Sequence, residues 1–438
     1  MTNPTRRDFI MTSTVAAGAA LAANFVPSNL YAAGDDEIRV GLIGCGSRGT
    51  GAIDNVLHSA RNVRIVALAD AFQDRADSCI KYVTEKVATQ KEVVDLGNTF
   101  DVKGRVFVGL KAYEDLLRTD CNYVMLATPP GFRPIHLAAA VAAGKNIFTE
   151  KPVAVDGPGI RSVLDTYEKA NEKKLAIVAG TQRRHQLGYL ETIKQLHDGA
   201  IGDILAGRCY WNMEILWCKP REKQWGDLEY QMRNWYNFTW VCGDHIVEQH
   251  VHNLDVINWV IGKTPVSAVG MGGRQRSVPN PQDYGNIFDH FAVDYEYPGG
   301  VHVLSECRQI SGCWNSVSEA VVGAKGTCQV NDYKINGKRI LSREQDKRAV
   351  DPYIQEHSDL IASIRSGKPL NELKTVAEST MTAILGRMAT YTGSDEGGRP
   401  LTWDRAINSK EELMPKDLDW KMTLAEPPVA VPGKTKFV

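Results

Sequence analysis

The stretch Ile38-Arg39-Val40-Gly41-Leu42-Ile43-Gly44-Cys45-Gly46-Ser47-Arg48-Gly49 decides the fold. Its first half is a short, β-branched apolar run, which predicts a buried parallel strand. Its second half is a G-x-G-x-x-G motif that leads into a helical stretch at about residues 51–58. In such a motif Gly44 makes the tight turn, Gly46 lets the backbone approach a pyrophosphate, and Gly49 lets helix and strand pack closely. The residues therefore predict a dinucleotide-binding loop with the phosphates at a helix N-terminus.

A second apolar strand is expected at residues 63–69, and it ends at Asp70. Asp70 follows Gly44 by 26 residues (70 − 44), near the place where this fold keeps an acid for the ribose. An acid there accepts hydrogen bonds from the 2′-hydroxyl and repels a 2′-phosphate, so the sequence favours NAD over NADP. The alternative is that Asp70 is only a solvated turn residue.

Further apolar strands alternate with helical stretches along the N-terminal part of the chain. The strands are expected at residues 106–108, 123–127 and 146–149, and the helices at 113–118 and 136–143. This alternation predicts a doubly wound parallel sheet of the α/β class. Ligands of such sheets bind beyond the carboxyl ends of the strands, which places Thr128, Pro129 and Glu150 at the cofactor crevice.

Composition limits the classes of protein that the chain can belong to. Its 438 residues suffice for two or three domains, and 43% hydrophobic with 24% charged residues is typical of a globular protein. A net charge of -1 provides no basic field for nucleic acid. The nine cysteines include no C-x-x-C pair, which argues against a structural zinc site, and we expect mostly buried free thiols. A Cys307–Cys313 pair stays open.

The first 33 residues are predicted to be a targeting signal rather than part of the fold. Arg6-Arg7 precede an Ala-rich apolar stretch at residues 15–26, and small residues follow at 32–34. This order is typical of a signal peptide, and the paired arginines with Phe9 resemble a twin-arginine signal. We therefore expect export to the periplasm or beyond by the route that carries folded proteins. The alternative is an accidental basic, Ala-rich terminus. No other apolar run predicts a membrane span.

Several segments together resemble one known family. They are Ala127-Thr128-Pro129-Pro130, His136, residues 142–152 (A-A-G-K-N-I-F-T-E-K-P), residues 180–185 (G-T-Q-R-R-H), residues 262–265 (G-K-T-P) and residues 323–327 (G-A-K-G-T). With the upstream glycine motif, E-K-P is fairly specific, and the sequence resembles the Gfo/Idh/MocA oxidoreductase family over nearly the whole mature chain. The resemblance implies a Rossmann domain followed by an α/β domain with a large, open, mostly antiparallel sheet.

The second half of the sequence is compatible with that implication. Residues 291–297 alternate with period two, Gly299 and Gly300 interrupt the pattern, and residues 301–304 resume it. Helices are expected at about residues 356–366 and 376–391, and the proline-containing tail is expected to be irregular. The predicted parts are a signal (1–33), a Rossmann domain (34–152), a substrate and oligomerisation domain (153–415) and an extended tail (416–438).

The resemblance also implies a set of catalytic residues. It implies a lysine from E-K-P, which is Lys151, and an acid four residues before a histidine, which are Glu248 and His252. The family usually has Asp where this chain has Glu248. On one helix this spacing places both side chains on one face. We assign His252 as general base, Lys151 to orient the substrate oxygen or share the proton relay, and Glu248 to position the sugar or His252. The alternatives are a core histidine and a surface lysine.

Two larger sets of residues are predicted to bind cofactor and substrate. The predicted cofactor-binding residues are Gly44, Gly46, Ser47, Arg48, Gly49, Asp70, Thr128, Pro129, His136, Glu150 and Lys151. The predicted substrate-binding residues are Arg183, Arg184, His185, Tyr189 and Asp255. Aromatic residues that could pack on a sugar, or simply fill the core, are Trp211, Trp217, Trp225, Trp235, Tyr236 and Trp240.

A metal site is the competing interpretation of the histidine-rich segment. His245, Glu248 and His252 fall at i, i+3 and i+7, with His250 nearby, and such spacing can bind zinc or manganese. The segment lacks the last histidine of an H-x-x-E-H motif because Gln249 stands there. We expect no metal, and the alternative stays open.

The resemblance and the residues together predict an exported NAD(H)-dependent oxidoreductase for a sugar or polyol, with its cofactor held tightly. A redox-neutral, NAD-dependent glycosidase is the main alternative, although the Y-P-T-H-G-type segment expected of that group is not found. A non-catalytic sugar- or NAD-binding protein is the third. No nucleic-acid partner is expected. The family's sheet often forms a subunit interface, which implies a homodimer or homotetramer.

Overall fold

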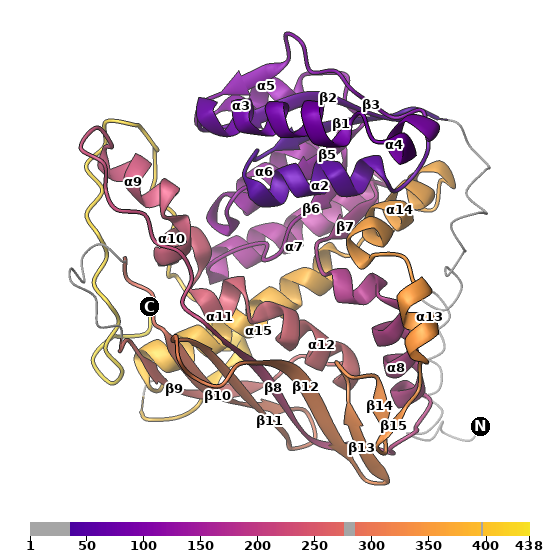
Figure 1. Cartoon of the computed structure of the whole chain (residues 1–438). Coiled ribbons are helices and arrows are strands. Elements are labelled where there is room, and N and C mark those ends of the chain that lie inside the picture. The colour runs from indigo at the N-terminus through magenta and orange to yellow at the C-terminus, as the bar shows by residue number, and fades with distance from the viewer. Residues whose placement is uncertain (1–35, 276–284, 396) are drawn as a thin grey trace, which may run out of the picture. The chain divides into compact units, whose positions relative to one another are not determined.

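The computed structural model describes residues 36–275, 285–395 and 397–438. The predicted signal segment, residues 1–33, lies outside the described residues. Residues Glu37–Val438 form one compact unit, which contains two β-sheets (Figure 1). In the part of the chain that is described, no helix is both long and apolar enough to cross a membrane.

The first sheet is parallel throughout, with the order β3-β2-β1-β5-β6-β7 and with β4 also paired to β2. Its strands are β1 (Ile38–Ile43), β2 (Val63–Asp70), β3 (Thr99–Phe100), β4 (Val106–Val108), β5 (Tyr123–Leu126), β6 (Asn146–Thr149) and β7 (Ile177–Ala179). The order reverses at β1, which confirms the predicted doubly wound sheet. Because β7 completes this sheet, the domain boundary predicted after residue 152 falls within it.

Helices cover both faces of the parallel sheet and bury two hydrophobic clusters. They are α2 (Ser47–Leu57), α3 (Gln73–Tyr82), α4 (Lys91–Asp95), α5 (Ala112–Leu117), α6 (Arg133–Ala142), α7 (Gly157–Glu172) and α14 (Pro352–Arg365), with a π-helical turn at Val83–Val87. Helix α7 begins where the Asp156 carboxylate accepts a hydrogen bond from Gly159 N at 2.8 Å. Helix α14 comes from far along the chain, and its His357 Nδ1 lies 2.7 Å from the Tyr123 hydroxyl oxygen in β5.

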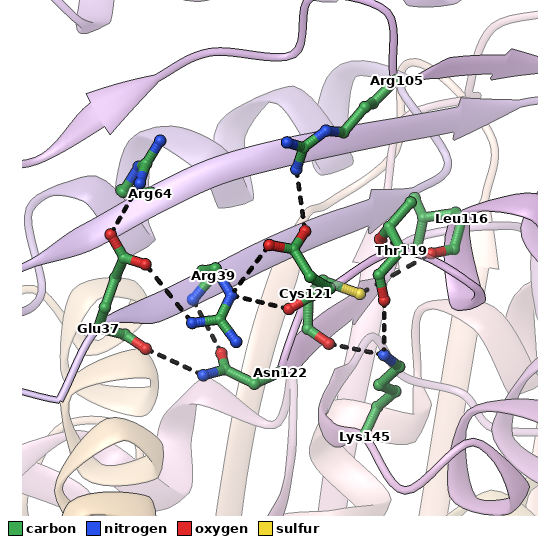
Figure 2. Close-up of polar contacts among 10 residues, drawn as sticks. Glu37, Arg39, Arg64, Arg105, Leu116, Thr119, Cys121, Asn122 and Lys145 are labelled. Carbon is green, nitrogen blue, oxygen red and sulfur yellow. Dashed lines mark hydrogen bonds and ion pairs between the residues drawn. The ribbon is translucent and has the colours of Figure 1, made fainter.

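Charged side chains tie the amino ends of the parallel strands together, at the edge opposite the glycine motif (Figure 2). The Glu37 carboxylate pairs with Arg64 at 2.9 Å and with Arg39 at 3.5 Å. The Asp120 carboxylate pairs with Arg105 at 2.9 Å, and the main-chain oxygen of Asp120 accepts a hydrogen bond from Arg39 Nε at 2.8 Å. These pairs are largely exposed and contribute little each, so they mark a structural edge rather than a functional one.

The second sheet has the order β15-β14-β13-β12-β8-β11-β10-β9-β16. Its strands are β8 (Ile204–Met213), β9 (Ser267–Gly273), β10 (His290–Tyr297), β11 (Val301–Gln309), β12 (Ser316–Gly323), β13 (Gly326–Gln329), β14 (Lys334–Ile335), β15 (Lys338–Arg339) and β16 (Leu401–Thr402). Among the strands that the structure describes, only β8 and β11 pair in parallel, so the sheet is mostly antiparallel, as predicted.

Helices between the two sheets bury one face of the second sheet (Figure 1). The long α15 (Leu373–Thr392) contacts α7 on one side and β9 on the other, which explains why it is buried along most of its length. The remaining helices are α8 (Leu187–His197), α9 (Asp227–Arg233), α10 (Thr239–Cys242), α11 (His245–Glu248), α12 (Val251–Ile261), α13 (Arg343–Arg348) and α16 (Trp403–Ile407), with 3₁₀ turns at Pro130–Phe132, Gln182–His185 and Trp235–Asn237.

After α16 the described chain to residue 438 is irregular, as predicted for the tail. All nine cysteines are free thiols, and seven of them are buried, which confirms that expectation. Cys307 is buried and Cys313 is exposed, and the two are not bonded to each other.

Candidate active site

A cavity of about 750 Å³ lies at the carboxyl ends of the parallel strands. Loops after β1, β2, β5 and β6 form one wall, and residues from β8 to α12 form the other. Ten of the eleven predicted cofactor residues line it, and Gly49 is buried behind the loop. The predicted catalytic residues Lys151, Glu248 and His252 line the same cavity. The prediction that ligands sit beyond the carboxyl ends of the strands therefore fits the shape of the molecule.

The glycine loop has the geometry that a pyrophosphate requires. Gly44 has φ +101°, and a Cβ there would lie 2.7 Å from the backbone of Ala127. A Cβ at Gly49 would lie 1.9 Å from the Gly44 carbonyl oxygen, so α2 and β1 are in closest contact there. At Gly46 a Cβ would meet open space. The loop fits a dinucleotide, because Gly44 and Gly49 leave no room for a side chain against the protein, whereas Gly46 faces open space that a pyrophosphate can occupy.

Asp70 braces this loop as well as facing the cavity. Its Oδ2 accepts from Cys45 N at 2.6 Å, and its Oδ1 accepts from Phe72 N at 2.8 Å. Burial raises the pKa of Asp70, although these two backbone hydrogen bonds act in the opposite direction. Each oxygen retains a second lone pair that could accept from a ribose hydroxyl. The bracing role was not part of the sequence prediction.

Arg48 is neutralised within the protein. Its Nε lies 2.6 Å from Glu150 Oε1, and its guanidinium stacks 5.0 Å from the ring centre of Tyr353. Tyr353 belongs to α14 and lines the cavity, but nothing near it in the sequence indicated a site residue. Arg48 and Glu150 therefore form one wall of the cavity as a pair.

Arg133 holds the ends of two strands in place. Its fully buried guanidinium donates to the main-chain oxygens of Thr128, after β5, and Glu150, after β6. Burial lowers the pKa of Arg133 to about 10. The neighbouring His136 Nδ1 lies 3.0 Å from Thr128 Oγ1, and burial together with Arg133 lowers the pKa of His136 to about 3. His136 is therefore neutral at neutral pH.

Lys151 and Glu248 form a close pair at the far end of the cavity. Lys151 Nζ donates to the main-chain oxygen of Glu248 at 2.6 Å and lies 3.2 Å from its Oε1. Each of the two side chains is only 9% exposed. Among the described residues the buried Glu248 Oε2 has no hydrogen-bond partner. An unpaired buried carboxylate oxygen in a cavity wall can accept a hydrogen bond from a ligand hydroxyl.

His252 lies on the same wall, but not on the same helix as Glu248. Helix α11 ends at Glu248 and α12 begins at Val251, so the prediction of one continuous helix is wrong. The turn at Gln249 still leaves both side chains facing the cavity. The His252 ring stacks on Trp211, with ring centres 5.8 Å apart.

The environment of His252 favours the neutral imidazole. Burial, and then the charges of Lys151 and Arg183, lower the pKa of His252 well below its usual value. A neutral imidazole can accept a proton from a ligand hydroxyl. When bound, a nicotinamide supplies the hydride acceptor that alcohol oxidation requires. Lys151, Glu248 and His252 can therefore bind, orient and deprotonate an alcohol.

The five predicted substrate residues are not among those that line the cavity. Each instead has a polar or charged partner inside the protein: Arg183 Nη1–Glu319 Oε1 2.5 Å, Arg184 Nη2–Asp255 Oδ1 2.9 Å, His185 Nδ1–Asp359 Oδ2 2.6 Å and Tyr189 Oη–Glu319 Oε2 3.2 Å. Their neighbours Gly180 and Gln182 do line the cavity. The partners Glu319 and Asp359 lie more than a hundred residues away in sequence, so no local pattern indicated these pairs.

The aromatic cluster divides between cavity and core. Trp211, Trp217, Trp235 and Tyr236 line the cavity, whereas Trp225 and Trp240 do not. Aromatic faces in such a wall suit the C–H faces of a sugar or cyclitol.

The histidine-rich segment does not converge on a metal site. His245 Nδ1 lies 3.1 Å from Asp244 Oδ1, and His250 Nε2 lies 2.7 Å from Ser305 Oγ. Within residues 36–275, 285–395 and 397–438, no three potential ligands are placed to hold a metal ion. The metal alternative at His245, Glu248 and His252 therefore has no support in the described structure.

The fold and the glycine loop define an NAD-binding oxidoreductase. Residues 38–179 match the model of the oxidoreductase family with an NAD-binding Rossmann fold, and residues 193–397 match the model of its C-terminal alpha/beta domain. The chain belongs to the Gfo/Idh/MocA family. Within the family it is similar to inositol dehydrogenases.

Relatives and solved structures agree with this assignment. An inositol 2-dehydrogenase from Gluconacetobacter diazotrophicus is 26% identical over 337 residues, which cover 75% of this chain and 87% of that protein. A glycosyl hydrolase family 109 protein from Shewanella baltica is 26% identical over 204 residues, 46% of this chain and 40% of that one. The structure of scyllo-inositol dehydrogenase from Lactobacillus casei with bound NAD(H) and scyllo-inositol shares the fold, with a TM-score of 0.59 and 18% identity over 84% of this chain and all of the other.

Proposed function

We propose that this protein is an exported oxidoreductase that transfers hydride between a hydroxyl-bearing carbon of a sugar or cyclic polyol and a tightly held NAD(H). The observation that carries the proposal is the contact of Lys151 with Glu248 beside the neutral His252. These groups share one cavity with the glycine loop, so a substrate held by them lies next to the cofactor.

Each of the three residues has a separate role in this proposal. His252 accepts the hydroxyl proton, because its imidazole is neutral and faces the cavity. Lys151 donates a hydrogen bond to the same oxygen and stabilises negative charge that develops there. Glu248 holds the Lys151 ammonium in place with Oε1 and accepts from a neighbouring hydroxyl with Oε2. Such a site favours a vicinal diol over an isolated alcohol.

The cofactor contacts follow from the cavity wall. The backbone at Gly44, Gly46 and Ser47 would hold the pyrophosphate of a bound NAD, and Asp70 would accept a hydrogen bond from its adenosine ribose. Thr128 and Pro129 border the nicotinamide half beyond β5. His136 and the Arg48–Glu150 pair shape the wall around the cofactor.

Substrate class is inferred from relatives and from the wall opposite the cofactor. The inositol dehydrogenases among the relatives support a cyclic polyol as the first class to test. The aromatic wall at Trp211, Trp217, Trp235 and Tyr236 can pack on either a cyclitol or a sugar ring.

Export and assembly are part of the same proposal. Export by the twin-arginine route rests on Arg6-Arg7 and the apolar stretch after them, and it suits an enzyme that folds around its cofactor first. A homodimer or homotetramer would bury the open face of the second sheet, where Met271 is 74%, Val269 48% and Leu304 43% exposed.

The decisive experiment mixes the purified holoenzyme with inositols, monosaccharides and glycosides, and follows NADH absorbance together with the products. NADH formed alongside a keto-polyol or keto-sugar is the expected result. No reaction with any member of the panel would contradict the proposed substrate class but would not affect the assignment of NAD as the cofactor.

A second candidate is the redox-neutral glycosidase. Its support is the similarity to glycosyl hydrolase family 109 proteins, which covers less than half of this chain. The same assay separates the two functions, because a glycosidase of this kind cleaves its glycoside without net NADH.

A further inference from the structure

A contact between the two halves of the chain lies at the adenosine end of the cavity. Phe72 lies in the loop after β2 and Asp74 in the first turn of α3, and they meet Arg233 from α9 and Trp420 from the C-terminal tail. We call Phe72, Asp74, Arg233 and Trp420 the adenosine clasp. None of these four residues was predicted to take part in a site.

Arg233 is the centre of the clasp. Its Nη2 lies 2.9 Å from Asp74 Oδ1 and its Nη1 3.1 Å from Asp74 Oδ2, a two-pronged ion pair that fixes the orientation of both groups. Its guanidinium also lies 4.0 Å from the ring centre of Phe72, within the range of a cation–π contact. Its side chain is 14% exposed, so the contacts are only partly screened by solvent.

The C-terminal tail closes the outer side of the clasp. The Trp420 ring lies 5.4 Å from the Phe72 ring, centre to centre. The tail and α9 run side by side (Figure 1), because Gln231 Nε2 donates to Leu424 O at 2.8 Å and Leu424 N donates to Asp227 Oδ2 at 3.1 Å. These two hydrogen bonds hold the tail against α9.

The clasp borders the place where the adenosine half of NAD belongs. Phe72 and Arg233 line the cavity together with Asp70, which lies two residues before Phe72. A ribose held by Asp70 would therefore lie beside Phe72 and Arg233. The contacts of Arg233 with Asp74, and of Phe72 with Trp420, hold these two wall residues in place.

We propose that the adenosine clasp retains NAD(H) between turnovers, so that the cofactor acts as a bound group rather than as an exchanging substrate. This inference rests on the proposed function only in placing NAD in the cavity, and it holds for either candidate reaction. It implies that the oxidising and the reducing half-reactions use the same cavity.

The test measures cofactor release, not turnover. The full-length enzyme is loaded with NADH and mixed with a large excess of NAD⁺, and the loss of bound-NADH fluorescence gives the release rate. Asp74→Ala and Trp420→Ala are expected to release NADH at least about tenfold faster than the wild type, and Trp420→Phe at an intermediate rate. Arg348→Ala is the control, since it removes an exposed arginine–carboxylate pair, with Glu344, and neither residue lines the cavity.

Release at the wild-type rate from both clasp variants, with unchanged circular dichroism, would overturn the proposal. If either variant fails to fold, the wild type still provides the test. High ionic strength weakens the half-exposed Asp74–Arg233 pair and is therefore expected to speed release from the wild type. The acceleration is expected to be smaller in Asp74→Ala, or in the milder Asp74→Asn if Asp74→Ala does not fold. A wild type whose NADH release does not become faster at high ionic strength contradicts the proposal. Since no sugar is present, failure of the proposed substrate class leaves this result unaffected.

Discussion

The Lys151 ammonium touches Glu248 twice, at its main-chain oxygen (2.6 Å) and at its carboxylate (3.2 Å). Lys151 follows β6 of the parallel sheet, whereas Glu248 ends α11 in the second half of the chain. The contact therefore fixes the ammonium by groups from both halves of the protein, and it leaves one carboxylate oxygen for a ligand.

Removing either partner is expected to reduce turnover while leaving NAD bound. Lys151→Met and Glu248→Gln should each lower kcat/KM by about 10²–10⁴, the range for groups that act on the proton or on its oxygen. Steady-state kinetics measure kcat/KM, and a fluorescence titration with NADH measures whether the cofactor still binds. Lys169→Met, which removes an exposed lysine paired with Asp165, is the control. Full activity in Lys151→Met would contradict the role assigned to Lys151 in catalysis.

The pH profile of oxidation should reflect the unusual His252. Because burial and the charge of Lys151 lower the pKa of His252, the imidazole stays neutral well below pH ~6.5. The rate of alcohol oxidation is therefore expected to stay flat from about pH 8 to 6.5 and to fall only in more acid buffer. In Lys151→Met the loss of positive charge should move that fall to higher pH. A wild-type profile that drops with an ordinary histidine midpoint would remove His252 as the base.

Alanine substitutions at Gly46 and Gly49 are expected to have different effects, one on NAD binding and the other on stability. A Cβ at Gly46 meets open space, so Gly46→Ala is expected to fold normally but to weaken NAD binding roughly tenfold or more, since the methyl group occupies the pyrophosphate approach. A Cβ at Gly49 would lie 1.9 Å from Gly44 O, so Gly49→Ala should lower the unfolding temperature itself. Thermal melts with and without NAD separate the two effects. Equal melting temperatures and equal NAD affinities would contradict this account of the loop.

His185 should make stability depend on alkaline pH. Burial alone would lower its pKa, but Glu372 and Asp359 outweigh it and raise the pKa to about 10. A folded-state pKa above the unfolded value near 6.5 means that the stabilisation is complete below pH ~6.5 and disappears as the pH rises through 10. His185→Gln is thus expected to be less stable than wild type by roughly 3 kcal/mol near pH 6, with a difference that shrinks toward pH ~10. Urea unfolding at several pH values measures this difference in the free energy of unfolding. His302→Gln, on the exposed sheet face, is the control. A difference independent of pH would contradict the assigned charge.

Arg183 should matter for stability rather than for substrate affinity. Its guanidinium lies 2.5 Å from the buried Glu319 carboxylate, and breaking a buried pair from one side typically costs about 3–5 kcal/mol. Arg183→Met is expected to unfold at lower urea concentration with an unchanged KM in the folded fraction. Replacing both partners, as in Arg183→Met with Glu319→Leu, should recover part of that loss. A raised KM without loss of stability would support the substrate role predicted from the sequence.

Local patterns were enough to predict which residues meet at the carboxyl ends of the parallel strands. The glycine loop, Asp70 and Lys151 each follow directly from a strand, and the carboxyl ends of parallel strands meet at one edge. The order of these strands in the chain therefore determines their closeness in space. For the same reason the doubly wound sheet was predictable from alternating segments.

Partners far apart in sequence could not be predicted in this way. Arg183 has the same appearance in the sequence whether it faces a ligand or the carboxylate of Glu319, which follows 136 residues later. Tyr353 lines the cavity because α14 packs against the first sheet, and no sequence motif indicates that α14 packs there. The break between α11 and α12 was likewise hidden, since the spacing of Glu248 and His252 fits an unbroken helix equally well.

The return of α14 also has a consequence during synthesis. The His357 ring of this helix lies 4.2 Å from the Phe148 ring, centre to centre, and its Nδ1 is hydrogen-bonded with the Tyr123 hydroxyl. It therefore completes the interior of a sheet whose last strand ended at residue 179. A ribosome that has made only the first sheet has therefore not yet made all of its core, and the nascent N-terminal half has to wait for residues 352–365. The core of the nucleotide-binding sheet can therefore be completed only late in translation, and not when its last strand has been made.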